Sequence, residues 1–171
     1  MAPSAWVARF APLVPDGAPV LDLACGAGRH ARLFLARGHP VLAVDRDLSR
    51  LGELAGAPGL EALACDLEGG SRPAFFDRRF GGIVVTNYLY RPLFAPIAAA
   101  LAPGGVLIYE TFARGNERFG KPSNPDFLLD SGELLAAFMG RLKIVAYEDL
   151  VVDSPRQAAV QRLCAMAPQA A

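Results

Sequence analysis

The sequence contains few of the side chains that hold metal ions or form disulfide frameworks. It has three widely separated cysteines that form no Cys-x-x-Cys pair, Cys25, Cys65 and Cys164. Its two histidines, His30 and His39, stand at no ligand spacing from the cysteines. An odd number of scattered cysteines does not build a disulfide scaffold or a structural zinc site. We therefore expect the cysteines to be small core or loop residues and expect no bound metal.

Long apolar runs and an excess of charge of either sign are also missing. No apolar stretch approaches the roughly 20 residues that span a bilayer, and residues 1–10 lack the pattern of a secretory signal peptide. Seventeen basic and seventeen acidic residues give a net charge of +0, which argues against binding to nucleic acid through bulk charge. The composition predicts a soluble, cytoplasmic protein without membrane contact.

What is present suits one folded domain. The chain has 171 residues, 53% of them hydrophobic and 20% charged, which is enough to bury one sizeable core and too apolar for a disordered chain. No internal repeat, low-complexity tract or linker divides the sequence. We expect a single domain over residues 1–171.

Short apolar runs alternate with helix-like stretches in the first two thirds of the chain. Strands are predicted at 19–24, 41–44, 60–64, 82–86 and 106–111, helices at 29–37, 47–55 and 91–101, and a short helix or loop near 77–79. The strands are apolar almost throughout, which is typical of a parallel sheet covered by helices on both faces. This pattern predicts an α/β fold.

The pattern changes after residue 112. A polar loop is predicted at 113–129, and Asp130 followed three residues later by Glu133 resembles the start of a helix that ends near Gly140. Residues 142–148 and 157–166 then read as two strands joined by a tight turn, which predicts an antiparallel pair at one side of the sheet.

Four residues mark the ends of successive predicted strands. They are Ala24, Asp45, Asp66 and Asn87, about 21 residues apart, the length of a compact strand–helix unit. Their side chains and backbones are expected to line one edge of the sheet, where open α/β folds bind ligands.

The turn after the first strand is the most informative segment. Gly26 and Gly28 would let a ligand approach the backbone, and the helix that begins at Arg29 offers unpaired N–H groups, which favours an anion or zwitterion site. Gly26, Gly28 and Ala31 also satisfy a loose dinucleotide-binding pattern. Asp22 favours the first interpretation, because a buried acid would repel a pyrophosphate and would pair with an α-amino group. The alternative is an Asp22 that only binds loop N–H groups.

Two further acids extend this site. Asp45 is placed to accept both ribose hydroxyls, or else to cap the following helix, and the acid beside Arg46 argues against a 2′-phosphate site. Asp66 is placed to accept a bond from an adenine amino group while the Leu67 N–H donates to the ring. An exposed loop acid is the alternative for Asp66.

Taken in order, these features resemble the motifs of class I S-adenosylmethionine-dependent methyltransferases. The resemblance rests on residues 22–30, 45, 65–67, 87–88 and 101–105. It covers residues 18–112 motif by motif and the remainder by strand order. The small size and the 22–30 motif look similar to small tellurite-resistance-type methyltransferases. The resemblance to class I methyltransferases implies a doubly wound, Rossmann-like three-layer sandwich with a seven-stranded, mostly parallel sheet whose last strand is antiparallel.

The resemblance also implies a cofactor, S-adenosyl-L-methionine, with S-adenosyl-L-homocysteine as its product. The 24–28 turn would hold the methionine part, Asp45 the ribose and Asp66 with Leu67 the adenine, while Asn87 would face the acceptor. The expected cofactor-binding residues are Arg9, Asp22, Ala24, Cys25, Gly26, Gly28, His30, Asp45, Arg46, Cys65, Asp66, Leu67, Asn87 and Tyr88.

The resemblance does not identify a catalytic base. Tyr88, Tyr90 and Glu110 are candidates by position, although a structural role is the alternative for each, and in-line positioning supplies much of such a reaction's rate. We expect an unidentified small-molecule acceptor rather than RNA. Two alternatives stay open: an NAD(P)-dependent oxidoreductase, and a non-catalytic S-adenosylmethionine-binding module.

Two segments are expected to shape the site. Arg9 is placed to reach the cofactor carboxylate while Trp6 closes over it, with an amphipathic surface helix as the alternative. The loop at 113–129 is long enough to be a lid over the acceptor pocket, and the basic residues at 114–122 hint at an anionic acceptor. A solvated loop is the alternative.

Overall fold

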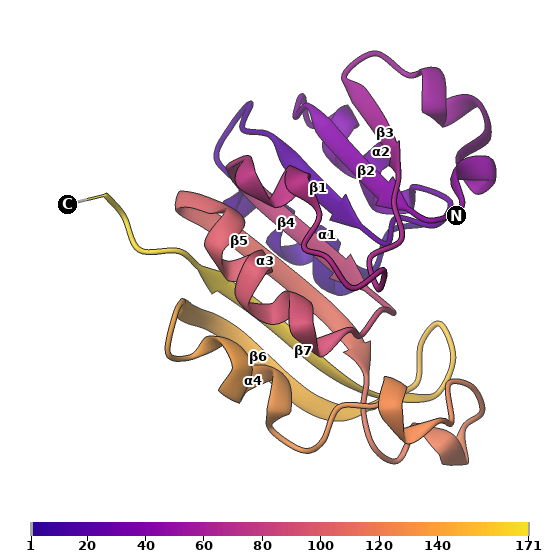
Figure 1. The fold of residues 1–171 in the computed structure, drawn as a ribbon. Helices are drawn as coiled ribbons and strands as arrows, with labels where there is room; N and C mark the ends of the chain where they lie inside the picture. Colours follow the sequence, from indigo (N-terminus) through magenta and orange to yellow (C-terminus); the bar gives the residue numbers. More distant parts are fainter. Residues whose placement is uncertain (1, 171) are drawn as a thin grey trace.

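The computed structural model describes residues 2–170 and shows one seven-stranded sheet (Figure 1). Its strands are β1 Val20–Leu23, β2 Val41–Asp45, β3 Leu60–Ala64, β4 Phe80–Thr86, β5 Leu101–Phe112, β6 Lys143–Val152 and β7 Ala158–Met166. They lie in the order β3-β2-β1-β4-β5-β7-β6. β7 alone runs antiparallel to its neighbours β5 and β6, and the other pairings are parallel. The predicted sheet, with its antiparallel pair at one side, is confirmed.

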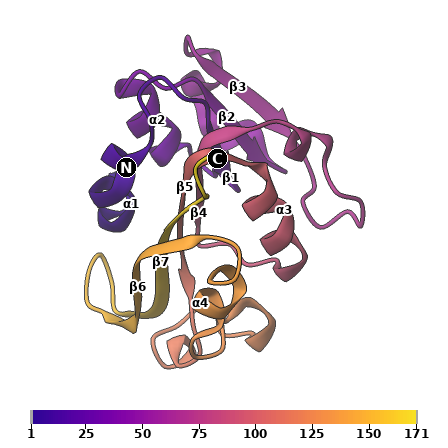
Figure 2. The same cartoon turned by 90° about the vertical axis from the view of Figure 1, so that its left-hand side faces the viewer.

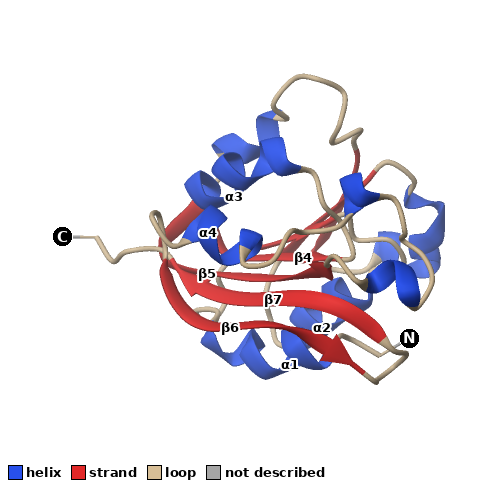
Figure 3. Cartoon of the chain, turned by 90° about the horizontal axis from the view of Figure 1, so that it is seen from below, coloured by secondary structure: helices blue, strands red, loops and turns tan. Residues whose placement is uncertain are grey.

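Helices cover both faces of this sheet (Figures 2 and 3). The α-helices are α1 Ala5–Phe10, α2 Arg29–Ala36, α3 Phe94–Ala100 and α4 Glu133–Phe138. The short 3-10 helices are η1 Ala11–Leu13, η2 Leu48–Gly56, η3 Ala74–Asp77, η4 Arg91–Leu93, η5 Asn116–Arg118 and η6 Pro125–Phe127. In Figure 3, α1 and α2 lie on one face of the sheet and α3 and α4 on the other. The predicted three-layer sandwich is therefore confirmed.

The central strands carry apolar side chains on both faces because both faces are buried. β1 and β4 separate two hydrophobic clusters, one under α1 and α2 and the other under α3 and α4. Alternation along β4 sends Ile83 and Val85 into the second cluster and Val84 into the first. The one acid of β1, Asp22, faces α2 and is only 2% exposed.

Two of the predicted helices differ from the sequence-based expectation. The helix predicted at 47–55 is the 3-10 segment η2, broken where Gly52 adopts a φ of 55°. The helix predicted at 91–101 divides into η4 and α3, and Leu101 already belongs to β5. Glycine permits the positive φ that interrupts η2, a conformation that helical periodicity does not reveal.

The start of α4 contains half of the predicted capping arrangement. Glu133 Oε2 accepts the backbone N–H of Asp130 at 2.8 Å, as the acid of a capping box does. The Asp130 carboxylate does not complete the box, because it binds Arg114 Nε at 3.0 Å. Within residues 2–170, no helix is long and apolar enough to cross a membrane.

Candidate functional site

A cavity of about 660 Å³ opens at the carboxyl ends of β1 to β4. It lies where open α/β sheets bind ligands, at the point where the strand order reverses. Its lining consists of Ala24, Cys25, Gly26, Ala27, Arg29, Asp45, Arg46, Arg50, Cys65, Asp66, Leu67, Glu68, Thr86, Asn87, Tyr88 and Phe127.

Most of the residues expected at a cofactor site line this cavity. They are Ala24, Cys25, Gly26, Asp45, Arg46, Cys65, Asp66, Leu67, Asn87 and Tyr88. The four others, Arg9, Asp22, Gly28 and His30, lie elsewhere. The four strand ends at 24, 45, 66 and 87 thus meet in one cavity, as their spacing predicts.

Two strand ends at the cavity have an unusual backbone. Ala24 has a φ of 56° and Asn87 a φ of 54°, and they are the only non-glycine residues with positive φ within residues 2–170. A side chain in this region costs on the order of 1 kcal/mol, and such residues are concentrated at binding and active sites. The Asn87 N–H is held by the Glu110 carbonyl at 2.9 Å.

Asp45 joins two of the loops that form the cavity. Its Oδ2 accepts the Gly26 N–H at 2.8 Å, and its Oδ1 accepts the Asp47 N–H at 3.1 Å. Each carboxylate oxygen retains a second acceptor position, because a carboxylate offers about four. The helix cap considered as an alternative is supplied by Asp47, whose Oδ1 accepts the Ser49 N–H at 2.9 Å.

The end of β3 forms the opposite wall. Asp66 Oδ1 accepts the Glu68 N–H at 3.0 Å, a local turn that fixes the carboxylate. Glu68 in turn accepts a bond of 3.3 Å from the Tyr88 hydroxyl, which joins this wall to the loop after β4.

Asp22 lies beneath the cavity rather than in its lining. Its Oδ2 accepts the Ala31 N–H in the first turn of α2 at 2.9 Å. Burial raises its pKa to about 7, against the smaller effects of the Ala31 bond and Arg29. The bond to a backbone N–H, considered as the alternative from the sequence, is the contact that the structure shows.

Gly28 also requires a correction, because its lack of a side chain serves packing and not ligand approach. It is buried, and a Cβ there would stand 2.4 Å from Leu54 Cδ2 and 2.8 Å from Leu51 Cδ2. Its φ of 69° adds the backbone reason for glycine at the N-cap of α2. Of the two loop glycines, only Gly26 lines the cavity.

His30 faces away from the cavity, into the layer formed by α1 and α2. It is 2% exposed, and its Nε2 accepts the Ser4 N–H at 3.1 Å. Burial, assisted by nearby Arg29, lowers its pKa to about 3, so that the ring is neutral at physiological pH. Its Nδ1 stands 3.5 Å from the hydroxyl oxygen of Thr86, which does line the cavity.

Trp6 and Arg9 do not close over the cavity. Trp6 is 3% exposed and donates its indole N–H to the Leu163 carbonyl at 3.2 Å. The Arg9 guanidinium lies over the rings of Phe10 and Trp6, with its carbon 4.9 Å and 5.7 Å from their centroids. The surface-helix alternative therefore describes α1.

None of the three residues considered as a catalytic base, Tyr88, Tyr90 and Glu110, is placed or charged to act as one in the structure. Burial and the nearby Glu68 raise the pKa of Tyr88 above its usual range, which disfavours loss of its proton. Glu110 is 8% exposed, forms an ion pair with Arg162 Nε at 2.5 Å and accepts the Ser4 hydroxyl at 2.8 Å. Tyr90 is outside the cavity lining.

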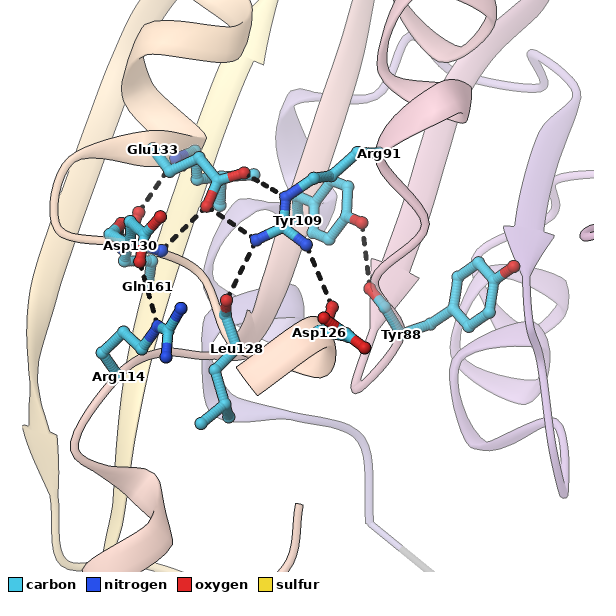
Figure 4. Close-up of polar contacts among 10 residues, drawn as sticks. Tyr88, Arg91, Tyr109, Arg114, Asp126, Leu128, Asp130, Glu133 and Gln161 are labelled. Atoms are coloured by element: carbon cyan, nitrogen blue, oxygen red, sulfur yellow. Dashed lines mark hydrogen bonds and ion pairs between the residues drawn. The ribbon is translucent and has the colours of Figure 1, made fainter. Parts of the chain in front are cut away.

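The loop at 113–129 reaches the cavity through one side chain, Phe127 of η6, which is 48% exposed. Figure 4 shows how this turn is held: Arg91 donates to the carbonyls of Asp126 and Leu128 at 2.9 and 3.0 Å. The same guanidinium binds both carboxylate oxygens of Glu133, at 2.5 and 3.0 Å. The basic residues at 114–122 are not part of the lining.

Sequence reasoning missed several residues of the lining. They are Arg29, Arg50, Glu68, Thr86 and Phe127, whereas Ala27 belongs to the predicted 24–28 turn. Arg29 and Thr86 adjoin predicted loop residues, so a wider window around each strand end would have found them. Arg50 and Phe127 reach the cavity from η2 and η6, and no local pattern marks their direction.

Within residues 2–170, no group of three or more His, Cys, Asp or Glu side chains is placed to hold a metal ion.

Comparison with known proteins identifies solved structures of similar architecture. No protein-family model matches the chain, and a search of curated proteins found no match. Among solved structures, TehB from Haemophilus influenzae is similar over 95% of this chain and 61% of that chain, with a TM-score of 0.77 and 15% identity. The chain thus spans less than two thirds of the TehB chain.

A second structure was crystallised with a nucleoside ligand. It is 1,6-didemethyltoxoflavin-N1-methyltransferase from Burkholderia thailandensis, with bound 1,6-didemethyltoxoflavin and S-adenosylhomocysteine. The match covers 96% of this chain and 77% of that chain, with a TM-score of 0.70 and 22% identity. The chain has the fold of class I S-adenosylmethionine-dependent methyltransferases.

The methyltransferase fold confirms the architecture that the sequence resemblance implies. It does not by itself decide the reaction, because a fold hosts unrelated activities. The cyclase SpnF is also similar, with a TM-score of 0.74 and 14% identity over 96% of this chain and 80% of that chain.

Proposed function

We propose that this protein is an S-adenosylmethionine-dependent methyltransferase that acts on a small-molecule acceptor. The observation that carries the proposal is the Asp45 carboxylate, fixed at the cavity by the Gly26 N–H at 2.8 Å. A carboxylate at the end of the second strand of such a sheet is the usual partner of ribose hydroxyls.

The cavity residues fit this cofactor. The cavity volume of about 660 Å³ suits a small-molecule site. Asp45 would bind the ribose, Asp66 and the Leu67 backbone the adenine, and residues 24–27 of the turn with Arg29 the amino-acid part. Asn87, Tyr88 and Phe127 line the same cavity and are assigned to the acceptor side.

When bound, the cofactor supplies an electrophilic methyl group on a sulfonium centre. The protein's task is to hold an acceptor in line with it, and such positioning is worth up to about 10 kcal/mol of the barrier. Tyr88 retains its proton and Glu110 is paired with Arg162. We therefore infer that the acceptor atom has a lone pair available for methylation and needs no protein base to remove a proton from it first.

The fold also suits the two alternatives from the sequence, an NAD(P)-dependent oxidoreductase and a binding module without turnover. Calorimetry with S-adenosylhomocysteine, NAD and NADP separates the first. We expect saturable binding of S-adenosylhomocysteine alone, and binding of a nicotinamide cofactor instead would reverse the assignment.

Turnover needs a separate measurement. Methyl-labelled S-adenosylmethionine, incubated with small thiols, thioethers, amines and oxyanions, is expected to transfer label to at least one class. Cofactor binding without transfer to any class would favour the module without turnover.

A further inference from the structure

Thr86, the last residue of β4, lies between the cavity and a buried histidine. It lines the cavity, and its hydroxyl oxygen is 3.5 Å from His30 Nδ1. Successive side chains of β4 point to opposite faces of the sheet. Val84 and Thr86, two residues apart, therefore face the layer of α2 together. The contact therefore follows from the strand register and the position of His30 in the first turn of α2.

The hydrogen bonds of His30 determine which ring nitrogen carries the proton. The Ser4 backbone N–H can only donate, so His30 Nε2, at 3.1 Å, must accept. A neutral imidazole has one donor and one acceptor nitrogen. Nδ1 is then protonated and faces the Thr86 oxygen as a donor. The Thr86 hydroxyl proton is directed elsewhere, and within residues 2–170 no acceptor takes it.

The surroundings of Thr86 favour an anionic partner. Leu23 pairs with Val85, so the next residues, Ala24 and Thr86, are neighbours at the ends of adjacent strands. Arg29 lines the same cavity, lies close enough to lower the pKa of His30, and takes part in none of the ion pairs among the described residues. A hydroxyl donor and a guanidinium that line one cavity are suited to a carboxylate.

We propose that Thr86 donates its hydroxyl proton to the carboxylate of the bound amino-acid nucleoside, and that His30 is a positioning residue, fixed by Ser4, that keeps Thr86 a donor. The ligand assignment rests on the proposed function. The state of His30 does not depend on it. The N-terminal segment thereby helps to set the polarity of a hydroxyl group in the cavity.

The tautomer is tested first, by nitrogen-15 NMR of the two histidines at neutral pH. We expect His30 to be neutral with its proton on Nδ1. Ser4→Pro removes the N–H while suiting the φ of −58° at this position, and Ser4→Ala keeps the N–H. Both lose the hydroxyl, so only Ser4→Pro should populate the Nε2–H tautomer. A charged ring, an Nε2–H wild type, or the same tautomer in both variants would overturn this part.

His39 is an internal control in those spectra. Its Nδ1 is 3.0 Å from the Ala18 carbonyl, which can only accept, so its tautomer is independent of Ser4. Its signals are expected to be the same in the wild type and both variants.

The carboxylate partner is tested by calorimetry with S-adenosylhomocysteine and with 5′-methylthioadenosine, which lacks the amino-acid part. We expect Thr86→Val to weaken S-adenosylhomocysteine binding about tenfold or more, the effect of losing a hydrogen bond to a charged group. Binding of 5′-methylthioadenosine should change less than about twofold. Thr86→Ser, which keeps the hydroxyl, should restore most of the affinity.

Two results would count against the carboxylate partner. One is unchanged S-adenosylhomocysteine binding in Thr86→Val, and the other is an equal loss for both ligands. If the wild type binds neither ligand, the proposed function fails, while the NMR experiment still decides the tautomer of His30.

Discussion

Asp45 Oδ2 accepts the backbone N–H of Gly26 at 2.8 Å, which joins the end of β2 to the turn after β1. The same carboxylate accepts the Asp47 N–H through its other oxygen at 3.1 Å. Its orientation is thus fixed by the protein before a ligand arrives. A group held in this way loses little conformational entropy on binding, which favours affinity.

Substitution of Asp45 tests its role in ligand binding. Asp45→Asn keeps the shape and removes the charge and one pair of acceptor positions, so S-adenosylhomocysteine affinity is expected to fall about 10- to 100-fold. Asp47→Asn is the matched control, because asparagine caps η2 as well as aspartate does. Calorimetry on both proteins gives the ratio, and equal affinities would contradict the assignment.

The two loop glycines are predicted to differ in their effect on stability. Gly28→Ala places a methyl group 2.4 Å from Leu54 and strains a φ of 69°, so we expect a loss of about 2–4 kcal/mol in the free energy of unfolding. Gly26→Ala meets its nearest neighbour, Arg50, only at 3.7 Å and should cost about 1–2 kcal/mol. Urea denaturation of both variants measures the difference. Equal losses would indicate that packing against η2 is not the reason for Gly28.

Asp22 is predicted to make stability depend on pH. Its pKa is raised from 3.8 to about 7, so the folded protein binds more protons than the unfolded chain between these values. The stability from this group is full below pH 3.8 and is lost as the pH rises through 7. Asp22→Asn keeps an oxygen for the Ala31 N–H and cannot ionise. Relative to the wild type, it should gain on the order of 2–4 kcal/mol between about pH 4 and pH 8.

Urea denaturation across this pH range measures the difference between the Asp22→Asn variant and the wild type. Exposed Asp16→Asn serves as a control and should follow the wild type at every pH. A difference between wild type and Asp22→Asn that does not change with pH would show that Asp22 is ionised throughout.

Arg91 is predicted to hold the turn that carries Phe127. Its guanidinium contacts two carbonyls and both oxygens of Glu133, a geometry that the single ammonium of lysine does not reproduce. In Arg91→Lys, amide hydrogen exchange over residues 125–129 should quicken several-fold while the sheet is unaffected. Arg114→Ala breaks an exposed pair with Asp130 and should leave that segment unchanged. The same exchange rate in both variants would show that Arg91 does not hold the turn.

Much of the architecture is evident in local sequence patterns. The strand at 60–64 and the helix start at Arg29 agree with the structure to the residue. These segments combine a continuous apolar run or a helical period with a clear turn signal, and neighbouring residues alone decide them. The break in η2 at Gly52 was missed, because one glycine interrupts a segment whose periodicity still looks helical.

The site was predictable to the extent that it depends on strand ends. Asp45, Asp66 and Asn87 meet at one edge because parallel strands end together, and their spacing in the chain already carries that information. Asp22 and His30 lie within the same motif, yet the alternation along β1 and the rotation of α2 turn both away from the cavity.

The order of apolar strands and polar strand ends determined by itself that this chain forms a doubly wound sheet whose polar strand ends meet at one edge, since both follow from periodicity along the backbone. Which side chains from outside the strand ends enter the cavity was decided only by tertiary structure. Arg50 and Phe127 reach it from segments that other contacts orient, and the buried His30 accepts a hydrogen bond from Ser4, which lies in a different part of the chain. Such contacts join residues far apart in sequence, and no local pattern records them.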